Sequence, residues 1–189
     1  MKLFCSIAWL AILAVGLNGC SCRDKNEKKD SSSAAKEIND KKFNRAKEKD
    51  ASFVVDILAA SYGEIQMAQL ARRRSANKET RDLAGMLESD YTAFIDELKT
   101  YAAKKNITIP QLEELEAKNA LDSLGKLKNR EFDKAWCKYL QDEHKLIIST
   151  FETASNDLVD EELKGWVNKM LPTLRMHHDK LMTCYTKLK

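Results

Sequence analysis

The stretch that decides the fold is residues 163–188, LKGWVNKMLPTLRMHHDKLMTCYTKL. Its apolar side chains recur in steps of four and three residues, the spacing that gathers side chains on one face of an α-helix. The positions on that face are Leu163, Val167, Met170, Leu174, His177, Leu181, Cys184 and Leu188. One histidine therefore interrupts an otherwise apolar stripe.

Three earlier stretches, about residues 51–77, 79–105 and 131–155, repeat this spacing. Each carries an acidic residue near the middle of its stripe, namely Glu64, Asp90 and Glu143. His144, beside Glu143, is expected to turn toward the flank of its helix.

The segment between the second and third stretches is a connection. Asn106-Ile107-Thr108-Ile109-Pro110 ends the second helix, because the residue before a proline is pushed out of helical geometry. Residues 111–128 are long enough for one shorter helix. The pattern predicts an all-α fold, a four-helix bundle over residues 51–189 with a long connection that contains a short helix.

The four polar residues Glu64, Asp90, Glu143 and His177 are expected to share one layer. If the third helix starts at the end where the second also starts, all four lie about 17 to 20 Å from that end. Burying charged groups is costly unless something pairs with them, so four converging groups point to a shared partner such as one divalent metal ion.

Three interpretations of the layer stay open. It is a single metal site to which His144 contributes, a two-metal oxidase centre, or a hydrogen-bonded network. In the network, the three carboxyl groups accept hydrogen bonds from His177, Tyr91 and water, and one or two of them are protonated.

The N-terminus predicts export. Lys2 precedes an apolar run that ends at Val15, which indicates a signal peptide over residues 1–19. Leu17-Asn18-Gly19-Cys20 resembles the lipobox of bacterial lipoproteins, and the resemblance implies an acylated Cys20. Ser21 after the cysteine implies, in similar proteins, an anchor in the outer membrane, with the chain facing the periplasm or the cell surface. The alternatives are an ordinary signal peptide cut near Gly19 and a retained anchor.

Residues 20–50 are polar and highly charged, so they are expected to form a flexible tether with only transient helix. The basic excess of the chain lies in this segment, which favours contact with anionic lipid. Residues 51–189 hold 21 basic and 22 acidic side chains. A domain with so balanced a charge lacks the excess of basic residues that is typical of nucleic-acid-binding domains.

Two cysteines of the expected bundle fall at one level of neighbouring helices. Cys137 lies six residues before Glu143, and Cys184 lies seven residues after His177. In an oxidising compartment they form a disulfide, or else they are two small buried apolar side chains.

Four segments together resemble domain-of-unknown-function family 4142, described as predicted outer-membrane proteins with a ferritin-like bundle. They are FVVDILAASYGEIQMAQLA (53–71), ESDYTAFIDELKTYAAKKNITIP (88–110), FDKAWCKYLQDEHKLIISTFE (132–152) and LPTLRMHHDKL (171–181). The resemblance covers about residues 50–188 and implies the same fold.

The resemblance also carries site residues. The family usually has an Asp-His pair on its second and third helices and Leu-Pro-x-Leu-x-x-His on the fourth. Residues 171–177 match the last motif, and Glu143-His144 stands for the third-helix pair. Asp90-Tyr91 departs from the pattern, because Tyr91 takes the histidine position. A phenol titrates near pH 10 and is a poorer metal ligand at neutral pH, so Tyr91 is expected beside the site.

Two functions follow as hypotheses. The first is a membrane-tethered binding or interaction module without catalysis. The second is a metal-binding protein, with iron, manganese or zinc, that serves storage, oxidase chemistry or stress protection. The residues name no substrate and no partner.

Overall fold

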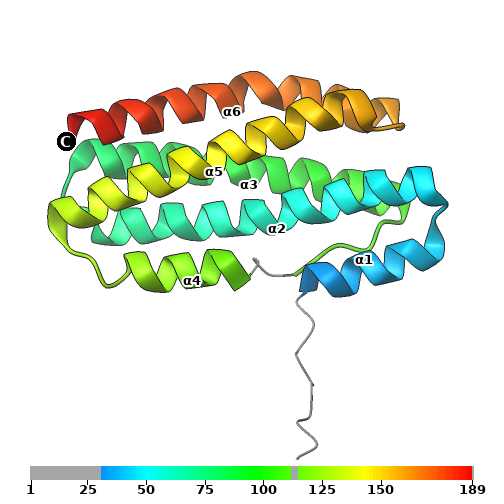
Figure 1. Cartoon of the computed structure of the whole chain (residues 1–189), viewed down its shortest axis with the longest axis horizontal. Helices are drawn as coiled ribbons and strands as arrows, with labels where there is room; N and C mark the ends of the chain where they lie inside the picture. Colours follow the sequence, from blue (N-terminus) through cyan, green and yellow to red (C-terminus); the bar gives the residue numbers. More distant parts are fainter. Residues whose placement is uncertain (1–30, 112–114, 189) are drawn as a thin grey trace, which may run out of the picture.

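The computed structural model describes residues 31–111 and 115–188, and it is all-helical over them (Figure 1). The expected signal peptide and Cys20 lie outside the described residues. The six helices of this part are α1 (Ser31–Lys42), α2 (Arg45–Arg74), α3 (Lys78–Lys105), α4 (Leu115–Leu124), α5 (Asn129–Asp157) and α6 (Glu161–Lys187). No strand occurs among them, which confirms the predicted all-α class. Among the described helices, none combines the length and the hydropathy of a membrane-spanning segment.

Polar caps set the helix ends. The side chains of Asn44, Asn77 and Asp160 accept hydrogen bonds from backbone N–H groups in the first turns of α2, α3 and α6. Asn106 ends α3 in the left-handed conformation, with φ at 57°. Pro110 follows four residues later, where the sequence predicts the end of this helix.

Four long helices, α2, α3, α5 and α6, lie side by side (Figure 1). Ion pairs between Lys187 and Glu79 and between Lys104 and Glu162 show that α3 and α6 are antiparallel. The connection after α3 returns along the molecule through α4, so α3 and α5 begin at the same end (Figure 1). The short helices α1 and α4 both lie against α2.

Aromatic side chains fill the centre of the bundle. Trp136, Phe132 and Phe151 are fully buried, and all three belong to α5. The indole N–H of Trp136 donates to the carbonyl oxygen of Met67 on α2 at 2.9 Å, which satisfies its one polar atom. A disulfide joins Cys137 on α5 to Cys184 on α6.

The structure differs from the expected flexible tether over residues 31–50. This segment forms α1 and the first turns of α2, and Ala35 and Asn39 are buried against the rest of the chain. Its order comes from polar bonds more than from apolar burial. The Asn39 amide donates to the carbonyl of Thr108 and accepts from its N–H, both at 2.8 Å.

Asp50 makes a similar contact at the same end of the bundle. Its carboxylate accepts hydrogen bonds from the backbone N–H groups of Val159 and Asp160, at 3.1 and 2.9 Å. These two bonds tie the start of α2 to the turn between α5 and α6. Hydropathy alone does not register such contacts, which is why the polar segment resembled a tether.

The contact between Asn39 and Thr108 gives a test of this packing. Asn39→Ala removes two hydrogen bonds to one backbone unit, so we expect the free energy of unfolding to fall by about 2 kcal/mol. Urea denaturation of the full chain measures the loss. Asp40→Ala is the matched control, because Asp40 is exposed, and it should change stability by less than about 0.5 kcal/mol. Equal effects of the two substitutions would show that α1 does not stabilise the bundle.

Candidate functional site

The expected polar layer lies at mid-height of the bundle, with residues from all four long helices. Glu64 comes from α2, Asp90 and Tyr91 from α3, Glu143 and His144 from α5, and His177 from α6. Their side chains do not surround one point. They form two hydrogen-bonded pairs and one separate pair of carboxyl groups.

The placement of Glu143 and His144 was predicted wrongly. His144 is fully buried, whereas Glu143 is only partly buried. A step of four residues from Leu140 leads to His144 and a step of three leads to Glu143, so the apolar spacing allows either orientation. The inward position goes to the imidazole, because a neutral ring is less costly to bury than a carboxylate.

The first pair joins Tyr91 and His144. His144 Nδ1 lies 2.8 Å from the carbonyl oxygen of Leu140, which can only accept, so Nδ1 carries the proton. Nε2 is then an acceptor, and the Tyr91 hydroxyl donates to it at 3.1 Å. Burial, and next the charge on His177, lowers the pKa of His144 to about 3. Burial also raises the pKa of Tyr91, which keeps its hydroxyl a donor.

The second pair joins Asp90 and His177. His177 Nε2 donates to the carboxylate of Asp90 at 2.8 Å, and the Asp90 side chain is 34% exposed. Burial lowers the pKa of His177, and the hydrogen bond to Asp90 opposes this shift. The other ring nitrogen, Nδ1, is buried without a hydrogen-bond partner. The rings of His144 and His177 meet edge to face, with centroids 5.5 Å apart.

The third group is the carboxyl pair of Glu64 and Glu143. Glu64 is 5% exposed, and burial, followed by the charge on Glu143, raises its pKa well above the ordinary value. Its Oε1 lies 3.9 Å from His144 Nδ1, too far for a hydrogen bond, and its Oε2 has no partner. Both glutamates line a cavity of about 80 Å³ enclosed by α2, α4 and α5.

This division bears on the expected metal ion. Within residues 31–111 and 115–188, no three His, Cys, Asp or Glu side chains are arranged to hold one ion. Asp90 and Tyr91 are each hydrogen-bonded to a histidine of the layer. The set Glu64, Asp90, Glu143, His144 and His177 therefore does not fit a single metal centre in this geometry.

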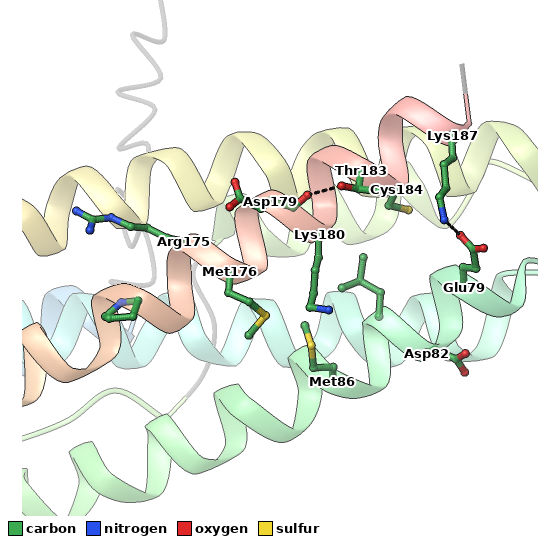
Figure 2. A pocket seen from close by; sticks show the side chains of 12 residues that line it. Glu79, Asp82, Met86, Arg175, Met176, Asp179, Lys180, Thr183, Cys184 and Lys187 are labelled. Carbon is green, nitrogen blue, oxygen red and sulfur yellow. Dashed lines mark hydrogen bonds and ion pairs between the residues drawn. The ribbon is translucent and has the colours of Figure 1, made fainter.

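A second feature, which the sequence did not predict, is a groove of about 920 Å³ between α3 and α6. Figure 2 shows Met86 on α3 and Met176 and Lys180 on α6 extending into the space between the helices. The ion pair between Glu79 and Lys187 lies at one end. We call this feature the α3–α6 groove. It depends on how far two helices separate along their length, which apolar spacing does not encode.

The protonation of His144 sets a pH dependence. Its pKa is about 3 in the folded chain and about 6.5 when exposed, so below pH 6.5 the unfolded chain binds a proton that the folded chain does not. Stability from this residue is therefore lost as pH falls from 6.5 toward 3. Between pH 7 and pH 5 the loss is about 2 kcal/mol.

We expect His144→Gln to remove this part of the pH dependence. Urea denaturation at pH 7 and pH 5 gives the difference for the parent and the variant. His178→Gln, which changes a histidine outside the two pairs, should keep the parent's difference. The assignment is wrong if His144→Gln and the parent lose the same free energy between the two pH values.

Comparison with known proteins identifies the family. No curated protein and no solved structure showed significant similarity to the chain. A family model, described as "Domain of unknown function (DUF4142)", matches residues 35–183. The match begins inside α1 and includes every residue of the two hydrogen-bonded pairs and the carboxyl pair. The chain belongs to the DUF4142 family.

Proposed function

We propose that this chain is a lipoprotein of the bacterial envelope, a ferritin-like four-helix bundle that binds a partner and does not catalyse a reaction. The lipobox-like residues 17–20 support the anchor. The common starting end of α3 and α5, with α4 in the long connection between them, supports the ferritin-like topology.

The α3–α6 groove is the observation that carries the binding role. Leu83, Met86 and Met176 give it an apolar lining, and methionine side chains adapt to different partner surfaces. On the other side of the Asp90–His177 hydrogen bond, the junction of α3 and α6 is closed by polar contacts such as the bond from Trp166 to Glu97. The groove thus occupies one half of the helix pair.

The charged residues that line the α3–α6 groove indicate the charge that a partner would carry. The groove residues Glu79, Asp82 and Arg175 are each paired with another side chain, Lys187, Lys78 and Glu152 respectively. Lys180, which also lines the groove, forms no ion pair with any residue that the structure describes. An amphipathic helix with an acidic residue beside its apolar stripe satisfies both the methionines and Lys180.

A photo-crosslinking side chain at position 176 tests the binding role in cells. Met176 is 36% exposed, and Leu146 on α5, which is 63% exposed, is the control position. We expect one defined protein adduct from position 176 and none of the same mass from position 146. Lys180→Glu in the same chain should abolish the adduct, because it repels the acidic residue of the partner.

Two results contradict this proposal. One is an identical adduct pattern from both positions, and the other is an adduct from position 176 that persists with Lys180→Glu.

The anchor is tested separately with the full chain. Cys20→Ser removes the thiol that would carry the lipid, so we expect the protein to move from the membrane fraction to the soluble fraction. Cys22→Ser is the matched control and should stay with the membranes, from which detergent but not high salt releases it. Membrane retention of the Cys20→Ser chain would contradict lipidation at this cysteine.

A further inference from the structure

The cavity between α2, α4 and α5 exists because several residues on its wall have small side chains or none. Ala59, Ala60 and Gly63 line it from α2, and Ala117 lines it from α4. Four such small residues leave about 80 Å³ beside the two glutamates, space for an ion with a few water molecules. The cavity lies apart from the α3–α6 groove, which no residue of α2 or α4 lines.

Glu64 lines this cavity, and one of its carboxyl oxygens has no hydrogen-bond partner. The residue is buried to about 95%, since only 5% of its surface is exposed, and Oε2 has no hydrogen-bond partner. A buried carboxyl oxygen left unpaired destabilises the fold unless something in the cavity binds it. A second carboxylate, Glu143, lines the same cavity from the facing helix.

Two facing carboxyl groups in one cavity favour a particular ligand. Two carboxyl groups in a medium of low dielectric constant resist ionising together, and a bound cation favours the form in which both are ionised. An anion or an apolar molecule would not. Carboxylate and water oxygens are hard donors, and such donors suit Mn²⁺, Ca²⁺ or Mg²⁺ better than metals that prefer nitrogen and sulfur.

We propose that Glu64 and Glu143 bind one hard divalent cation in the cavity between α2, α4 and α5, and that Asp90 and His177 take no part in holding it. This site is independent of the groove and of the partner-binding role. It also differs from the expected layer, because its ligands come from α2 and α5 alone, with water completing the coordination.

Mn²⁺ is the probe, because the electron paramagnetic resonance signal of the free ion falls as the ion binds. The full chain in detergent is titrated with Mn²⁺ alone, and we expect one saturable site per chain. Glu64→Gln and Glu143→Gln should each weaken binding by at least about tenfold, since each removes one negative ligand. Glu64→Gln is nearly isosteric and uncharged, so thermal unfolding should show that this variant still folds.

Two kinds of control separate this site from its alternatives. Asp142→Asn removes the same charge one residue away, from a carboxylate that pairs with Lys138 and Lys145 and does not line the cavity. It should bind Mn²⁺ as the parent does. Asp90→Asn and His177→Gln should also leave the affinity unchanged.

Three outcomes overturn the proposal. The first is no saturable Mn²⁺ binding by the parent chain, which would mean that water alone fills the cavity. The second is an equal loss with Asp142→Asn and Glu64→Gln, which would mean diffuse attraction to acidic side chains. The third is a loss with Asp90→Asn or His177→Gln that Glu64→Gln does not reproduce, which would place the ion among the histidines.

Discussion

The hydrogen bond from His144 Nδ1 to the carbonyl oxygen of Leu140 is the constraint on which the polar centre depends. Because Nδ1 holds the only ring proton, Nε2 must receive a hydrogen bond from another element. A hydroxyl such as that of Tyr91 supplies one. Tyr91 is therefore best understood as the donor that matches the tautomer of His144.

The central acidic residues of α2 and α3, Glu64 and Asp90, have different surroundings. Asp90 is partly exposed and accepts a hydrogen bond from His177, so its charge is compensated by water and by an N–H donor. Glu64 is buried, its Oε2 has no hydrogen-bond partner, and its raised pKa reflects the burial. The central acidic residues of the apolar stripes therefore do not form one shared binding site. Solvent access and the available donors separate the two carboxyl groups.

The sequence predicted where the helices lie along the chain better than it predicted which of their side chains point inward. Apolar spacing places the four long helices, and Pro110 marks the end of α3 near Asn106, because both signals lie within the segment itself. It does not choose between Glu143 and His144, which are adjacent on α5. It also fails over residues 31–50, where order depends on Asn39 meeting Thr108 and on Asp50 meeting the turn before α6. Those partners lie far apart in the chain, and no local pattern encodes them.

The buried pair of Tyr91 and His144 also lies between Glu64 on one side and the Asp90–His177 hydrogen bond on the other. On one side, Glu64 Oε1 lies 3.9 Å from His144 Nδ1, whose N–H already donates to the carbonyl oxygen of Leu140. On the other side, Asp90 and His177 form their own bond at 2.8 Å. Among the residues that the structure describes, no chain of hydrogen bonds links Glu64 through the neutral ring of His144 to Asp90. The cavity between α2, α4 and α5 and the α3–α6 groove can therefore act independently.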